Sequence, residues 1–300
     1  MATSSVQGCC LCGELRWEID LPLDWATHCH CSICRRSHGS VFATYVVGPA
    51  DSFRWVAGEA QTGSYESSPG FHRHFCSTCG SVSPDRMGEV AFMAAGCLDA
   101  DPQLRPDRHI FVDSRASWYE IPEDDLARHG AYAQPIAEAQ RSPTPELPEL
   151  SRPGLLRGGC LCGAVAYEVG PGVGIVHCHC SRCRKSRSAA HASNVMCRAQ
   201  GFVYARGADL VTTYKVPEAE MFTTAFCAVC GGGLPRDPGT APFAVVPGGS
   251  LDTDPGTLPQ VHIFVGSKAP WFEIRDAVSQ NETYVPGFAN SHEWAAAQGG

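Results

Sequence analysis

The chain has 300 residues, of which 44% are hydrophobic and 18% are charged, and its formal net charge is −8. This composition predicts a folded globular protein of about two domains and argues against wholesale binding to nucleic acid, because the phosphates would be repelled. No stretch reaches the ~18 uninterrupted apolar residues of a membrane span, and the N-terminus lacks the basic and apolar pattern of a secretion signal. We therefore expect a soluble, cytoplasmic protein.

Cysteine usage is the most unusual feature of the composition, with 17 cysteines in the chain. The number is odd, and most of these residues stand in C-x-C and C-x-x-C pairs. In a reducing compartment, such pairs are typical of metal ligands rather than of disulfides. The cysteines therefore predict metal sites.

Most sequence motifs occur twice, about 150 residues apart. The matching segments are 8–18 and 158–168, 28–36 and 177–185, 75–80 and 226–231, 109–112 and 262–265, and 118–121 and 271–274. A repeat of this length fits one complete domain per copy. We predict a first domain over residues 1–134, a Pro-rich exposed linker over 135–154 and a second domain over 155–290.

Strand signals dominate each copy. Short β-branched and aromatic runs, such as 41–47, 53–56 and 109–112, are separated by Gly, Pro and Asp turns. Long stretches of helical period are absent from the sequence. We predict a short helix over 122–133 and a helical turn that begins near Ser32, within two small, mainly β domains whose cores are completed by metal.

The first candidate metal site combines a C-x-C pair with a C-x-x-C pair. In copy one these are Cys10 with Cys12 and Cys76 with Cys79, and four thiolates are the ligand set of a closed, structural zinc site. The corresponding thiols of copy two are Cys160, Cys162, Cys227 and Cys230. We predict one structural zinc in each copy.

A second cluster in copy one has only three thiols, Cys29, Cys31 and Cys34. The corresponding thiols of copy two are Cys178, Cys180 and Cys183. Three protein ligands leave a fourth position open, as in catalytic zinc sites, where a thiolate or a water could bind. The alternative is a second structural site in which His28 or His30 is the fourth ligand, and the sequence leaves both open.

Side chains near the three-thiol cluster offer charge and proton transfer. Arg35 and Arg36 follow Cys34 directly, and guanidinium groups bind carboxylates bidentately. His38 is a candidate proton carrier, because neutral imidazole titrates in a useful range. In an extended chain the side chain of His30 should point away from the sulfurs, and His109 is expected to be a satisfied core or edge histidine.

Taken together, these motifs resemble the glutathione-dependent formaldehyde-activating enzyme family, also called the centromere-protein-V family. The resemblance rests on G-x-C-x-C-G, C-H-C-x-x-C-R, R-x-F-C-x-x-C-G and the closing H-I-F-V and W-Y-E-I. It implies two tandem β-tent domains, with structural zinc on the four-thiol clusters and labile, catalytic zinc on the three-thiol clusters. The implied activity joins a thiol such as glutathione to formaldehyde, as a carbon–sulfur lyase acting in reverse.

We therefore expect an enzyme in which Cys29, Cys31 and Cys34 carry the chemistry. Arg35, Arg36 and Arg73 are expected to hold the carboxylates of a small-molecule thiol, in a monomer or homodimer. Copy two keeps its zinc thiols but lacks the Gly and Arg of the family pattern, so it is expected to support copy one. The rival hypotheses are a non-catalytic zinc scaffold and a methionine sulfoxide reductase that uses Cys97.

Overall fold

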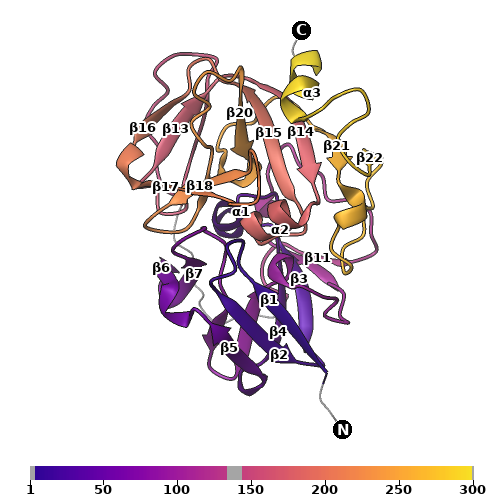
Figure 1. The fold of residues 1–300 in the computed structure, drawn as a ribbon. Coiled ribbons are helices and arrows are strands. Elements are labelled where there is room, and N and C mark those ends of the chain that lie inside the picture. Colours follow the sequence, from indigo (N-terminus) through magenta and orange to yellow (C-terminus); the bar gives the residue numbers. More distant parts are fainter. Residues whose placement is uncertain (1–3, 134–143, 299–300) are drawn as a thin grey trace.

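The computed structural model describes residues 4–133 and 144–298, which form two mainly β domains, one for each copy of the repeat (Figure 1). This confirms the predicted fold class. Residues 134–143 of the predicted linker lie outside the described residues. The part that follows them runs along copy two, where the carbonyl oxygen of Pro148 accepts a hydrogen bond from Arg157 at 3.3 Å.

Copy one contains eleven strands and one α-helix in chain order. They are β1 (Ser5–Cys9), β2 (Arg16–Asp20), β3 (Trp25–Cys29), α1 (Ser32–His38), β4 (Ala43–Pro49), β5 (Phe53–Ala57), β6 (Thr62–Ser68), β7 (Phe71–Cys76), β8 (Asp85–Met87), β9 (Val90–Ala94), β10 (Arg108–Ile110) and β11 (Ala127–His129).

Copy two repeats this order and adds a C-terminal helix. Its elements are β12 (Leu156–Gly159), β13 (Ala166–Val169), β14 (Gly172–Cys178), α2 (Ser181–Arg187), β15 (Ala192–Arg198), β16 (Val203–Arg206), β17 (Val211–Lys215), β18 (Thr223–Cys227), β19 (Gly233–Leu234), β20 (Phe243–Pro247), β21 (Pro259–Ile263), β22 (Ser279–Asn281) and α3 (Ser291–Gln298).

Each copy builds three corresponding sheets. In copy one the orders are β1-β2-β5, β11-β10-β3-β4-β9-β8 and β6-β7. In copy two they are β12-β13-β16, β20-β15-β14-β21-β22 and β17-β18-β19. The largest sheet of each copy carries the three-thiol motif at the end of a central strand, β3 or β14, so both motifs start from the best-anchored part of their domain.

The helical turn predicted from Ser32 is confirmed as α1, but the predicted helix over 122–133 is wrong. That segment contains β11 and no helix. Asp124 instead accepts a bond from His109 Nε2 at 2.8 Å, and Asp125 adopts a left-handed backbone with φ of 60°. A left-handed residue cannot continue an α-helix.

The two copies pack through an interface with approximate twofold character. Helix α1 packs on the single turn η6 (Gly248–Ser250) of copy two, and α2 packs on the equivalent turn η3 (Ala95–Cys97) of copy one. Figure 1 shows the two helices meeting between the domains. A Cβ at Gly96 or Gly249 would clash with backbone of the other copy, so both contacts depend on glycine.

Eight histidines among the described residues lie buried around this interface. They are His28, His30, His38, His109, His177, His179, His191 and His262. Phe42 of copy one packs edge-to-face against His191 of copy two with ring centroids 5.5 Å apart. Burial on this scale holds the two copies as one packed unit and lowers the pKa of His28, His177 and His191 well below 6.5. No helix among the described residues has the length and apolar character to cross a bilayer.

Candidate metal centres and active site

The four-thiol clusters are assembled in both copies. Their Sγ atoms all lie within 4.8 Å of one another, in the sets Cys10, Cys12, Cys76 and Cys79, and Cys160, Cys162, Cys227 and Cys230. The Sγ atoms of Cys10 and Cys12 are 3.3 Å apart, far beyond the ~2.05 Å of a disulfide. Zinc–sulfur bonds of ~2.3 Å would space tetrahedral sulfurs by about 3.8 Å, so the donor set fits zinc.

The three-thiol cluster of copy one is built by the end of β3 and the start of α1. Cys29 ends the strand, and Cys31 caps the helix by accepting from the backbone N–H of Cys34 at 3.3 Å. All three thiols are buried and lie within 4.8 Å of one another. The thiols of Cys31 and Cys34, together with burial, raise the pKa of Cys29 well above its usual value. Three such thiols ionise together only beside a cation, which is the environment that zinc supplies.

Neither candidate histidine joins this cluster. His28 Nδ1 lies 2.8 Å from Thr44 Oγ1, and His30 Nε2 lies 2.8 Å from His109 Nδ1. His30 is directed away from the sulfurs and is fully buried rather than at the surface. Because the carboxylate of Asp124 must accept from His109 Nε2, His109 Nδ1 accepts from His30. Among the described residues the cluster therefore has three protein donors.

The three-thiol cluster of copy one opens into a cavity of about 330 Å³. Cys29, Cys31 and Cys34 line one part of it, and Tyr45 and Arg73 line another. Most of the remaining wall is apolar, formed by Trp25, Ile33, Phe71, Met87, Phe92, Ile110 and Phe111. The arrangement places three metal-binding sulfurs, the hydroxyl of Tyr45 and the guanidinium of Arg73 in a largely apolar space, which Tyr132, His72, His74 and Asp85 also line.

Arg73 is the predicted arginine that the structure brings to the thiols. Its Nε donates to Ser67 Oγ and its Nη1 to Tyr45 Oη, both at 3.3 Å. Behind Tyr45 lies His38, whose Nε2 is 2.9 Å from the same hydroxyl. His38 is 1% exposed and does not line the cavity, so it contacts the site only through Tyr45.

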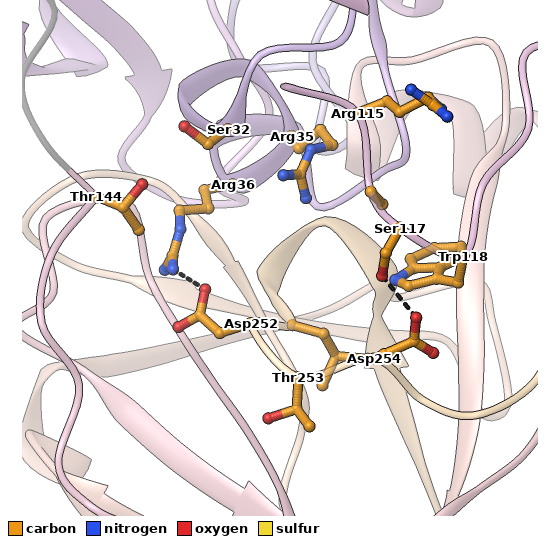
Figure 2. A pocket seen from close by; sticks show the side chains of 12 residues that line it. Ser32, Arg35, Arg36, Arg115, Ser117, Trp118, Thr144, Asp252, Thr253 and Asp254 are labelled. Carbon is orange, nitrogen blue, oxygen red and sulfur yellow. Dashed lines mark hydrogen bonds and ion pairs between the residues drawn. The ribbon is translucent and has the colours of Figure 1, made fainter. Parts of the chain in front are cut away.

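Arg35 and Arg36 lie elsewhere, in a separate pocket of about 190 Å³ between the copies (Figure 2). Arg36 is buried, forms an ion pair with Asp252 and donates to the carbonyl oxygens of Gly159 and Cys160 at 3.1 Å each. Arg35 donates through Nε to the carbonyl oxygen of His30 at 3.3 Å. Arg36 thus fastens copy one to copy two, whereas Arg35 is held within copy one, and neither arginine lines the cavity beside the thiols.

The three-thiol cluster of copy two keeps its ligands but has different neighbours. Its sulfurs also lie within 4.8 Å of one another. The hydrophobic cluster around Cys178 includes Trp294 of α3, and Cys180 and Cys183 pack against that cluster. Helix α3 lies beyond the predicted domain boundary at residue 290. A Cβ at Gly174 would clash with the ring of Trp294, so this glycine makes room for the indole.

The unmatched cysteines take no part in a cluster. Cys97 and Cys197 are fully buried, and the Sγ of Cys97 lies 3.2 Å from Ser188 Oγ of copy two. A buried Cys97 at the interface gives a methionine sulfoxide no route of approach. Cys9 lies 2.6 Å from Lys185 Nζ at the edge of the same interface.

Sequence reasoning missed Tyr45 and Trp294. Tyr45 stands in an ordinary strand pattern, and only its pairing beside Thr27 brings it over the thiols. Trp294 lies outside the repeat. The sequence gives one indication of its role. Copy two has Gly174 where copy one has Trp25, and the missing side chain leaves space that another residue can fill.

The comparisons with known proteins agree with both copies of this arrangement. The sequence model of the glutathione-dependent formaldehyde-activating enzyme family matches residues 5–114 and 155–267. A Halomonas elongata protein is 33% identical over 147 residues, which span 44% of this chain and 92% of that protein. Its name, provisional in its own description, is glutathione-dependent formaldehyde-activating enzyme.

A solved structure of a Rhodobacter sphaeroides protein is 27% identical and covers 34% of this chain and 97% of its own. Its TM-score of 0.27 carries no argument about the fold. The two family matches fall on the two halves of the repeat, each with one four-thiol and one three-thiol cluster. The chain belongs to the glutathione-dependent formaldehyde-activating enzyme family, with two copies of the family domain in tandem.

Proposed function

We propose that this chain is a zinc-dependent carbon–sulfur lyase that makes or breaks a bond between a glutathione-like thiol and an electrophilic carbon such as formaldehyde. The reaction is assigned to the three-thiol cluster of copy one. The observation that carries the proposal is the cavity of about 330 Å³, which is shared by Cys29, Cys31, Cys34 and Arg73.

Zinc bound by these three thiols would stabilise the sulfur of the substrate as a thiolate, whether that sulfur attacks or leaves. In the forming direction, a new carbon–sulfur bond replaces the carbonyl π bond, and the carbonyl oxygen gains the proton that the thiol loses. No other oxidant, reductant or group donor is needed. The protein's remaining tasks are to hold the thiol's carboxylate, to exclude water and to move that proton.

The residues that line the cavity indicate which part of a substrate each of them would contact. Arg73 is a half-buried cation in this wall and is suited to one carboxylate of the thiol. The apolar wall exceeds what formaldehyde alone would contact, so it favours a substrate with an apolar part in addition. Arg35 and Arg36 are absent from this proposal because neither lines the cavity: Arg35 bonds to backbone of copy one and Arg36 to copy two.

Matched variants in the two copies test the proposed function. Cys31→Ser removes a ligand in copy one, and Cys180→Ser removes its counterpart in copy two. With glutathione and formaldehyde as substrates, adduct formation should fall roughly 10³-fold in Cys31→Ser, the scale of losing a group that acts in the transition state. It should stay within about threefold in Cys180→Ser. The reverse result would assign the activity to copy two, and a wild-type protein with bound zinc but no turnover would favour a scaffold.

A further inference from the structure

A continuous chain of hydrogen bonds leads from the copy-one cavity into the backbone of copy two. Arg73 Nη1 is 3.3 Å from Tyr45 Oη, and Tyr45 Oη is 2.9 Å from His38 Nε2. On the far side of the imidazole, His38 Nδ1 is 2.9 Å from the carbonyl oxygen of Arg187 and 3.0 Å from that of Ser188. The last two acceptors belong to the end of α2 in copy two.

The partners at each end fix the position of every proton in this chain. A carbonyl oxygen only accepts, so His38 carries its proton on Nδ1, and Nε2 of the neutral ring is an acceptor. A guanidinium only donates, so Tyr45 Oη accepts from Arg73 and donates its own proton to His38 Nε2. Burial, together with the charge of Arg73, lowers the pKa of His38 to about 4, consistent with a neutral ring at pH 7.

The two carbonyl groups are available because of where α2 ends. The last carbonyls of a helix have no partner inside it. The chain turns away after Arg187 through Ser188, which has a left-handed φ of 51°. Ser188 is held there from copy one, where the backbone N–H of Val82 donates to its Oγ at 2.8 Å. Copy one thus holds the carbonyl groups of Arg187 and Ser188 in place, and these groups in turn fix the ring of His38.

Copy two lacks the same chain at its own three-thiol cluster. The strand register makes Asn194 the counterpart of Tyr45, because these residues pair with Val176 and Thr27, the residues before His177 and His28. Thr224 stands where copy one has Arg73, and Arg187 ends α2 where His38 ends α1. Within the described residues, the hydroxyl, imidazole and guanidinium come together at one of the two clusters.

We propose that Tyr45 is a catalytic residue that transfers the proton of the substrate oxygen, and that His38, held in one tautomer by the backbone of copy two, is its positioning residue and proton acceptor. This inference rests on the proposed function of the cavity. It gives the second copy a direct part in the reaction of the first.

The same two proton transfers, between substrate and Tyr45 and between Tyr45 and His38, serve both adduct cleavage and adduct formation. In adduct cleavage the substrate hydroxyl gives its proton to Tyr45 Oη, and Tyr45 gives its own proton to His38 Nε2. The electron pair of that O–H bond becomes the carbonyl π bond, and the carbon–sulfur pair leaves with sulfur. In adduct formation the thiol first gives its proton through Tyr45 to His38 Nε2, and the sulfur pair then forms the carbon–sulfur bond. The carbonyl π pair becomes the third lone pair of oxygen, which takes a proton from Tyr45, and the imidazolium of His38 returns its Nε2 proton to Tyr45. The imidazolium that forms transiently donates Nδ1–H to the two carbonyl groups of copy two.

The test uses the full chain loaded with zinc, with glutathione and formaldehyde as substrates. Tyr45→Phe keeps the ring and removes the transferred proton, whereas His38→Gln keeps donors and acceptors but cannot take up a proton. Each should lower kcat about 100-fold, the ordinary contribution of a general acid or base, with KM for glutathione within about threefold. The double variant should be no slower than the slower single variant, because both act in one relay.

Asn194→Ala is the matched control in copy two and should leave kcat unchanged. The relay is overturned if Tyr45→Phe keeps kcat within threefold of the wild type, or if the two defects multiply in the double variant. A merely structural role would also appear as loss of zinc or a lower melting temperature, which are measured in each variant. Cys31→Ser separates the two proposals: loss of activity there with full activity in Tyr45→Phe sinks the relay alone, and full activity in Cys31→Ser sinks the proposed function as well.

Discussion

The two three-thiol clusters have the same ligands and opposite surroundings. In each copy a cysteine ends the central strand, the next caps a short helix, and the third lies in its first turn. Around Cys29, Cys31 and Cys34 there is a cavity with an arginine and a tyrosine. Around Cys178 there is hydrophobic packing that includes Trp294. We infer that both copies keep their metal-binding thiols because the fold requires them. The reactivity of each cluster then depends on the side chains around the thiols.

The two copies differ most clearly at one strand position, which is Trp25 in copy one and Gly174 in copy two. Trp25 pairs with Val47 and lines the copy-one cavity, where it is 37% exposed. Gly174 pairs with Met196 at the equivalent place in copy two, and the indole of Trp294 packs over it. A side chain from outside the repeat therefore packs at this position of copy two, while Cys180 stays partly exposed.

Removing the covering indole should produce the largest change. Trp294 is 6% exposed, and its truncation to Ala should destabilise copy two by about 3–5 kcal/mol, the usual cost of deleting a buried aromatic ring. The half-exposed Trp25→Ala is the control and should cost less than about 1.5 kcal/mol. Chemical denaturation measures both.

Loss of the cavity's guanidinium should have the next largest effect. Arg73→Met should raise KM for glutathione by about 10- to 100-fold, because a charge-assisted hydrogen bond contributes about 1.5–3 kcal/mol. Thr224→Val at the matched position of copy two should leave KM unchanged. Steady-state kinetics decides the matter, and an unchanged KM in Arg73→Met would remove this residue from substrate binding.

The buried histidines give a smaller, pH-dependent difference between the copies. Burial, followed by the nearby His179 and His262, holds the pKa of His191 well below 6.5. As the pH falls through 6.5 the unfolded chain takes up a proton there and the folded chain does not, so this histidine's share of stability is present above that pH and is lost below it. Phe42 is the counterpart of His191 in copy one.

His191→Phe should therefore flatten the fall of unfolding free energy with pH. Near pH 5 the slope should decrease by about 1.4 kcal/mol per pH unit, which corresponds to one proton. Protonation of the thiol ligands affects wild type and variant equally and cancels in the difference. Parallel profiles from pH 7 to 5 would show that His191 titrates alike in both states.

Much of the scaffold could be predicted from the sequence because its signals are local or repeated. The C-x-C and C-x-x-C spacings specify the ligand sets, and their recurrence specifies two domains. The helical turn at Ser32 follows from the same motif, since Cys31 caps it through its own sulfur.

The copy-one cavity could not be predicted in the same way, because its parts come from separate strands and the groups behind it from the other copy. Arg35 and Arg36 are next to Cys34 in the sequence, yet consecutive helix positions face in different directions. Arg35 bonds to the backbone of His30 and Arg36 to that of Gly159 in copy two. Arg73 reaches the thiols from β7, and Tyr45 from β4. The acceptors of His38 are backbone atoms, which carry no sequence signal at all.

The most direct measurement of the central claim replaces zinc by Co²⁺ and titrates the protein with glutathione. A thiolate that enters an open cobalt site adds sulfur-to-cobalt charge-transfer absorption. The account predicts saturation at one glutathione per chain, loss of the signal in Cys31→Ser and its retention in Cys180→Ser. Saturation at two per chain, or a signal that disappears in Cys180→Ser and persists in Cys31→Ser, would contradict it.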